Sequence, residues 1–298
     1  MRRIKQLVLW VLALCTSVPL LDSCANARYA MGPETSDIEA LPGYEGTIKA
    51  ITYKSSEPRV SFRRFVAYLP KGYGDVPGKR YPVMYLLHGA RGNEVTWIER
   101  GDALITLDSL RAEGAAEDFI LILANVNNYF SDKEYRNGHA INAVRAFWLV
   151  DGETETHFME DLVHTVDSVL LTIPEKESRA IAGMSTGGMQ AAFLSANHPG
   201  SFGYVGLFSG YKYNTVFGLR HPEFYCGINR KMKAQFADPP KYYGLMIGDT
   251  DIFYPHNRIF DRDMTRKKYA HEMLVTPGGH EWYNWRKFLI HFYGKVFK

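Results

Sequence analysis

The chain has 298 residues, of which 46% are hydrophobic and 14% aromatic, and its 35 Lys and Arg nearly balance its 32 Asp and Glu. This composition excludes a disordered chain, and the length suits one large domain or two small ones. The formal net charge is +3 and no block of like charges occurs, so nothing in the sequence indicates a nucleic-acid-binding surface. Three cysteines are too few for a disulfide-rich scaffold.

The first 27 residues have the layout of a secretory signal peptide. Basic residues among the first five precede an almost unbroken apolar run, 7–21, which is too short to span a membrane. Two processing sites compete: residues 25–27 suit ordinary cleavage, whereas 21–24 resemble a lipoprotein box that would leave lipid on Cys24. We expect an exported protein, periplasmic, extracellular or anchored at the cell surface, whose membrane contact is at most a lipid on Cys24.

After a predicted tail at 28–42, residues 43–298 alternate short apolar runs with helical periods, as one domain. The predicted strands are 47–53, 62–69, 83–87, 119–125, 179–182, 205–208, 243–247 and 272–276. The clearest helices are 102–113, 155–171 and 188–197. This alternation predicts an α/β fold, with a mostly parallel central sheet and helices on both faces. The aromatic-rich segments 127–154 and 210–241 match neither the strand pattern nor the helix pattern.

The most informative stretch is Gly-x-Ser-x-Gly-Gly at residues 183–188, which follows a short apolar strand and opens an Ala-rich helix. A serine hydroxyl becomes a useful nucleophile when a sharp strand-to-helix turn exposes it, and the glycines allow the tight backbone approach there. The N-terminus of the helix also favours negative charge that develops during a reaction. The pattern therefore predicts a nucleophile elbow, with Ser185 as the nucleophile.

A second apolar strand ends in a turn that contains two glycines, residues 88–92. Such a turn leaves backbone N–H groups free to point at a substrate. We expect an oxyanion hole made by the N–H groups of Ala90 and of Thr186, the residue after the nucleophile. His88 precedes Ser185, whereas the histidine of this arrangement follows the nucleophile. We therefore expect His88 to fix the turn by hydrogen bonding rather than to act as a base.

The base and the acid should both follow Ser185 in the chain. Of the downstream histidines, only His280 lies in a glycine turn just past the last predicted strand, and we predict that it is the base. The strand before that ends in two carboxylates, Asp249 and Asp251, either of which could orient the imidazole. The residues alone leave both open. Asp263 lies further along, in a predicted helix, and is interpreted as a solvated charge.

Four motifs occur in order along the chain: His88-Gly-x-x-Gly92, Phe158-Met-Glu-Asp-Leu162, Gly183-Met-Ser-x-Gly-Gly188 and Gly278-Gly-His-x-Trp-x-x-Trp285-Arg286. From about residue 43 onward the chain thereby resembles the esterase D family of α/β-hydrolases. That family includes carbohydrate-esterase family 1 feruloyl and acetylxylan esterases, S-formylglutathione hydrolases and mycolyltransferases. The resemblance implies an α/β-hydrolase fold, and the family's Gly-x-x-Asp motif implies Asp251 as the acid. Glu281 and the Ala90-Arg91 turn depart from the family's pattern.

The predicted activity is that of an exported serine carboxylesterase on plant or surface polysaccharide esters, of the feruloyl or acetylxylan type, with no metal and no cofactor. The alternatives are an acyltransferase with the same three residues, an S-formylglutathione hydrolase-like thioesterase, and a non-catalytic glycan-binding protein on a hydrolase scaffold. Aromatic rings suit a flat acyl group or a sugar. The candidate substrate contacts are Phe147, Trp148, Tyr211 and Trp282, together with His88. Trp282 and Trp285 are also expected to pack beside His280.

Overall fold

The structure is a computed structural model that describes residues 35–90, 92–127, 152–212 and 222–298. The predicted signal peptide and residues 28–34 of the predicted tail lie outside the described residues, as does most of the segment 127–154. Within the described ranges, no helix combines the length and the apolar character needed to cross a membrane.

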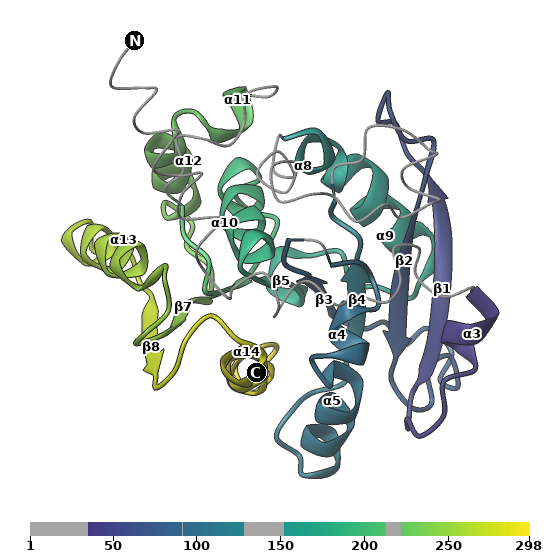
Figure 1. The fold of residues 1–298 in the computed structure, drawn as a ribbon. Helices are drawn as coiled ribbons and strands as arrows, with labels where there is room; N and C mark the ends of the chain where they lie inside the picture. Colours follow the sequence, from purple (N-terminus) through teal and green to yellow (C-terminus); the bar gives the residue numbers. More distant parts are fainter. Residues whose placement is uncertain (1–34, 91, 128–151, 213–221) are drawn as a thin grey trace.

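The described residues form one eight-stranded sheet in the order β1-β2-β4-β3-β5-β6-β7-β8 (Figure 1). The strands are β1 Thr47–Lys54, β2 Phe62–Leu69, β3 Val83–Leu87, β4 Ile120–Ala124, β5 Arg179–Met184, β6 Tyr204–Phe208, β7 Tyr242–Gly248 and β8 Glu272–Thr276. β2 pairs antiparallel with both β1 and β4, and every pairing from β4 through to β8 is parallel. The predicted, mostly parallel sheet is confirmed.

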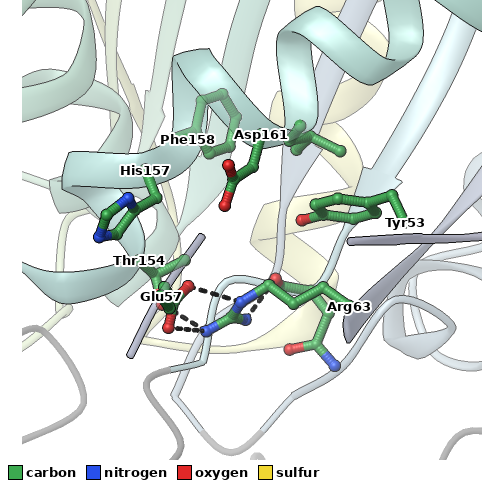
Figure 2. A pocket seen from close by; sticks show the side chains of 9 residues that line it. Tyr53, Glu57, Arg63, Thr154, His157, Phe158 and Asp161 are labelled. Carbon is green, nitrogen blue, oxygen red and sulfur yellow. Dashed lines mark hydrogen bonds and ion pairs between the residues drawn. The ribbon is translucent and has the colours of Figure 1, made fainter. Parts of the chain in front are cut away.

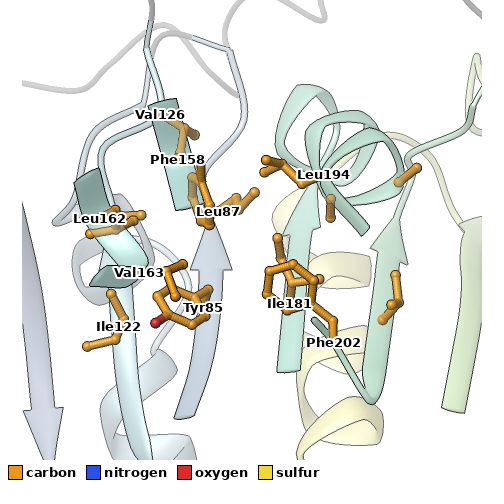
Figure 3. Packing of buried hydrophobic residues seen from close by; sticks show 14 of the residues in the cluster. Tyr85, Leu87, Ile122, Val126, Phe158, Leu162, Val163, Ile181, Leu194 and Phe202 are labelled. Carbon is orange, nitrogen blue, oxygen red and sulfur yellow. The ribbon is translucent and has the colours of Figure 1, made fainter. Parts of the chain in front are cut away.

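Strands buried on both faces explain why the sequence shows continuous apolar runs here rather than alternation. All five residues of β3 are buried, and they divide between two hydrophobic clusters. Tyr85 and Leu87 point to one face, where Figure 3 shows them packed with Phe158 and Leu162. Met84 and Leu86 belong to the cluster on the other face. Each face of the sheet therefore needs its own covering layer of helices.

Helices cover both faces of the sheet, as predicted (Figure 1). Among the described residues, the first cluster includes residues of the π-helix Phe158–Val163 and of α9 His164–Val169, α10 Thr186–Asn197, α11 Pro222–Tyr225, α12 Ile228–Gln235 and α13 Tyr254–Arg266. The second includes residues of α3 Thr35–Glu39, α4 Thr96–Glu99, α5 Ala103–Ala112 and α14 Trp282–Tyr293.

One helix prediction is corrected, and a segment with no predicted helix or strand contains two helices in its described residues. The continuous helix predicted over 155–171 is a composite of α8 (Glu153–His157), a π-helix (Phe158–Val163) and α9. Apolar spacing alone does not distinguish i→i+5 from i→i+4 bonding over so short a stretch. The unassigned segment 210–241 contains α11 and α12, and residues 213–221 within it lie outside the described residues.

Parallel strands place their carboxyl ends at one edge of the sheet, which is where open α/β sheets bind ligands. At that edge β3 leads into His88, β5 into Ser185, β7 into the turn with Asp251, and β8 into the turn with His280. Four predicted residues that lie far apart in the sequence therefore follow neighbouring strands.

Candidate active site

Ser185 lies at the sharp turn between β5 and α10. Its backbone has φ 54° and ψ −118°, a conformation that is costly for a residue with a side chain. Both backbone groups of Ser185 are hydrogen-bonded. The Ser185 N–H donates to the carbonyl oxygen of Phe208, at the end of β6, at 2.8 Å, and the Ser185 carbonyl accepts the Met189 N–H at 3.0 Å. The predicted strand–turn–helix context of the nucleophile elbow is present.

Glycine is required next to this turn because two backbones meet there. A Cβ added at Gly187 would overlap the carbonyl oxygen of His88, in the turn after β3. On the other side, a Cβ at Gly89 would lie 3.4 Å from the Cβ of Ser185. The turn with the nucleophile and the turn with the predicted oxyanion donor are therefore packed directly against each other.

Ser185, His280 and Asp251, here called the triad, form a continuous chain of hydrogen bonds. The Ser185 hydroxyl lies 2.9 Å from Nε2 of His280, and Nδ1 of His280 lies 2.9 Å from Oδ2 of Asp251. Asp251 is 3% exposed, and its other oxygen accepts the Phe253 N–H at 2.8 Å. In neutral His280, the carboxylate holds the proton on Nδ1 and leaves Nε2 free to accept from the serine.

The geometry separates the two carboxylates that the residues alone left open. Asp249 lies two residues before Asp251, but its Oδ1 accepts the Gly278 N–H at 2.9 Å and does not contact the imidazole. Asp251 alone of the two bonds to His280. The structure thus brings together the three residues predicted as nucleophile, base and acid.

Two aromatic rings enclose the imidazole. Trp285 lies edge to face with His280 at 4.9 Å between ring centroids, and its indole N–H donates to the Ser209 hydroxyl at 3.1 Å. Phe253 contacts the ring from another direction at 5.2 Å. Trp285 was predicted in this role. Phe253 was missed, although its position two residues after the acid was a usable signal.

The predicted oxyanion donors lie beside the serine. Thr186 is the first residue of α10, so its N–H has no acceptor within the helix. Ala90 follows Gly89, which lies against Ser185, and it is partly exposed. The β3 end that carries this turn is fixed by Trp97, whose indole N–H donates to the Leu87 carbonyl at 3.0 Å. The role of both N–H groups as oxyanion donors stays a prediction.

His88 is a turn-fixing residue, and its inclusion among the substrate contacts is wrong. The ring is buried; Val126 N–H donates to Nε2 at 3.0 Å, and Nδ1 donates to the Gly89 carbonyl at 2.8 Å. Because a backbone N–H can only donate and a carbonyl can only accept, these partners fix the neutral tautomer. Neither ring nitrogen is left for a substrate.

Burial lowers the pKa of His88 to about 4 from an ordinary value of 6.5. Between these values the unfolded chain binds a proton that the folded chain does not, so stability falls as pH falls. We expect the stability advantage of the wild type over His88→Gln to shrink by about 2 kcal/mol between pH 7 and pH 4.5. Urea unfolding of both proteins at the two pH values measures it, and an unchanged difference contradicts the assignment.

The other candidate substrate contacts lie at different distances from His280, and two of them are not described by the structure. Tyr211 is 5% exposed and its ring lies against Phe253 and His256, at 5.2 and 4.8 Å, one ring away from His280. Trp282 is partly exposed and contacts Trp285 rather than His280 itself, so it supports the imidazole only through a second ring. Phe147 and Trp148 lie outside the described residues.

Asp263 is in the predicted helix, α13, but its interpretation as a solvated charge is wrong. It is 6% exposed and forms an ion pair with Lys212, which is 1% exposed and follows β6. Lys267 also binds it, at 2.9 Å, and these partners hold the pKa of Asp263 well below its ordinary value even though burial opposes this. Lys212 belongs to the segment 210–241, for which no helix or strand is predicted, so this pairing had no local signal.

A separate pocket, between the β4 end and the π-helix, is lined by a buried charge pair (Figure 2). Arg63 binds both carboxylate oxygens of Glu57, at 2.6 and 2.8 Å, and donates to the carbonyls of Asn125 and Asn127. These two residues flank Val126, the residue that holds His88. Of the described residues that line the pocket, none belongs to the triad. The cluster stabilises the segment after β4 on which the His88 turn rests.

Comparison with known proteins identifies relatives of this chain. A family model described as "Putative esterase" matches residues 61–244, a range that includes Ser185 and ends before Asp251 and His280. An endo-1,4-beta-xylanase/feruloyl esterase from Xylanibacter ruminicola is 32% identical over 260 residues, which are 85% of this chain and 32% of the relative. The chain spans about a third of the length of the curated relatives it matches.

Several solved structures share the fold. A ferulic acid esterase superposes with a TM-score of 0.67 at 22% identity, covering 85% of this chain and 98% of that chain. A CE1 ferulic acid esterase from Anaeromyces mucronatus gives 0.66 at 22% identity, with coverages of 90% and 97%. An S-formylglutathione hydrolase from Staphylococcus aureus gives 0.61 at 16% identity, with coverages of 84% and 97%. The fold is that of the α/β-hydrolases, and the chain belongs to the esterase family that the matching model describes.

Proposed function

We propose that the protein is a serine carboxylesterase that hydrolyses acyl esters of polysaccharides. The observation that carries the proposal is the hydrogen-bonded triad, with Ser185 on a strained turn and its hydroxyl 2.9 Å from Nε2 of His280. A serine on such a turn, with a histidine held by a buried carboxylate, is the arrangement that activates a hydroxyl for attack on a carbonyl. Membership of an esterase family supports the same chemistry.

The reaction proceeds in two steps. The Ser185 hydroxyl attacks the ester carbonyl carbon while His280 Nε2 takes its proton, and Asp251 stabilises the imidazolium that forms. The N–H groups of Ala90 and Thr186 donate to the oxyanion of the tetrahedral intermediate. The C–O bond to the sugar then breaks, His280 returns the proton to the leaving hydroxyl, and an acyl-serine remains. Water, deprotonated by His280, attacks the acyl-serine; the bond to Ser185 Oγ breaks, His280 returns the proton to that oxygen, and the carboxylic acid is released.

The acyl group that we propose is feruloyl, with acetyl as the competing acyl group. The relative at 32% identity carries feruloyl esterase in its name and aligns with 85% of this chain. The ring of Phe253 lies next to the imidazole, and the rings of Tyr211 and His256 pack around Phe253; this aromatic group would suit a flat aromatic acid. A polysaccharide substrate fits export through the N-terminal segment, which we propose delivers the protein to the periplasm or the cell surface.

The test compares two polymers. The purified chain is incubated with feruloylated arabinoxylan and with acetylated xylan, and the free acids are measured by chromatography against a Ser185→Ala control. We expect free ferulate, with less acetate. Acetate alone would change the acyl group to acetyl, and acyl transfer to an added sugar would make the protein a transferase. The absence of any acid from both polymers and from methyl ferulate would refute the proposal.

A further inference from the structure

The segment that carries His280 is rich in glycine, the residue with the greatest backbone freedom in an unfolded chain. Two glycines, Gly278 and Gly279, directly precede His280, and Gly278 has φ +113°, a conformation that favours glycine. Glycine loses more conformational freedom on folding than any other residue. A catalytic imidazole, however, must be held within about 0.5 Å of its working position. Some other part of the molecule has to immobilise this pair.

All four backbone polar groups of the glycine pair are hydrogen-bonded. The Gly278 N–H donates to Oδ1 of Asp249 at 2.9 Å, and the Gly278 carbonyl accepts the Thr250 N–H at 3.1 Å. The Gly279 N–H donates to Oε1 of Glu281 at 3.0 Å. The Gly279 carbonyl accepts from Nδ2 of Asn284 at 2.9 Å. The first two bonds join the turn of His280 to the turn that carries Asp251.

Asn284 is the buried member of this set. Asp249 and Glu281 are exposed, whereas Asn284 on α14 is 0% exposed. Its side-chain oxygen accepts the Thr276 hydroxyl at 2.8 Å, which fixes the amide with its NH₂ group toward Gly279. Because the Asn284 side chain is removed from water, its bond to Gly279 competes less with solvent than the bonds from the exposed Asp249 and Glu281 carboxylates.

We propose that Asn284 is a positioning residue for His280: from α14, it clamps the carbonyl of Gly279 and so sets the distance between the imidazole and Ser185. The inference rests on the proposed serine mechanism and extends it to a residue outside the triad. Asn284 itself is buried beneath the turn and touches no reacting atom. Its loss therefore lowers the reactivity of Ser185 and leaves substrate affinity unchanged.

Asn284→Asp tests the clamp, because it keeps the acceptor for Thr276 and replaces the donor to Gly279 with a carboxylate oxygen. We expect kcat on methyl ferulate to fall about 10- to 100-fold, with KM within about twofold of wild type. The rate at which a phosphonofluoridate labels Ser185 should fall in parallel, since it reports the serine–histidine pair without a substrate. In proton NMR, the deshielded Nδ1 proton of His280 should broaden or shift.

Two variants at residue 276 provide a second test of the clamp in case the Asn284→Asp protein does not fold. Thr276→Val removes the hydroxyl that orients Asn284 and should slow labelling several-fold, and Thr276→Ser restores the donor and should restore the rate. Folded Asn284→Asp or Thr276→Val protein that is labelled at the wild-type rate overturns the inference. A wild type that is labelled but hydrolyses no ester overturns the proposed function instead, and the labelling ratios still test Asn284.

Discussion

Ser185→Ala should reduce the kcat for p-nitrophenyl acetate and methyl ferulate by on the order of 10⁶-fold, while the protein stays folded. The removed hydroxyl is the attacking atom, so the acyl-enzyme cannot form, and what remains is the stabilisation that the oxyanion donors give to attack by water. The loss corresponds to about 8 kcal/mol of transition-state stabilisation. Steady-state rates at saturating ester, with circular dichroism of both proteins, measure it.

Ser195→Ala is the matched control. Ser195 is a buried serine of the same helix, and its hydroxyl donates to the Ala192 carbonyl at 3.2 Å, within α10. Its removal should leave kcat unchanged within about twofold, because it lies away from the carboxyl edge of the sheet. Wild-type rates from Ser185→Ala, or an equal loss from both variants, would exclude Ser185 as the nucleophile.

The strands and the nucleophile turn could be predicted because their signals are local. The central strands are short apolar runs, and burial of both faces keeps those runs continuous, as in β3 and β4. Ser185 and His280 are marked by glycines at the ends of such runs. No comparable local signal marks the order of the strands, the antiparallel direction of β2 or the π-helix. The strand order and the direction of β2 were therefore not predicted, and the π-helix was predicted as ordinary helix.

The site residues that sequence could not resolve depend on contacts between distant segments. Asp249 and Asp251 lie two residues apart after the same strand, and the residues alone do not separate them. The family resemblance implied Asp251, and the fold shows that Asp251 reaches His280. Asp263 resembles any charged helix residue until Lys212 is placed against it. Asn284 lies in α14, where the spacing of the apolar residues predicts a helix and says nothing about a polar residue among them. Its proposed role depends on its hydrogen bond to the carbonyl of Gly279, which only the fold shows.

Asp251→Asn should lower kcat by on the order of 10⁴-fold, with little change in fold. An asparagine of the same shape can turn its NH₂ group toward Nδ1 of His280, which favours the tautomer with the proton on Nε2. That tautomer cannot accept the proton of Ser185, and the developing imidazolium also loses its carboxylate partner. The pre-steady-state burst of p-nitrophenol should slow together with kcat, because formation of the acyl-enzyme is the step affected.

Asp249→Asn is the decisive companion, since the two carboxylates are two residues apart and only one should matter for proton transfer. Asp249 accepts a single backbone N–H, from Gly278, and the carbonyl oxygen of asparagine can accept the same bond. We expect a loss of no more than a few-fold. A 10⁴-fold loss in Asp249→Asn with near-normal Asp251→Asn would reverse the assignment of the acid. Comparable losses in both variants would instead mean that Asp249 and Asp251 hold His280 together, so that the position of the His280 turn contributes as much to the rate as the charge of Asp251.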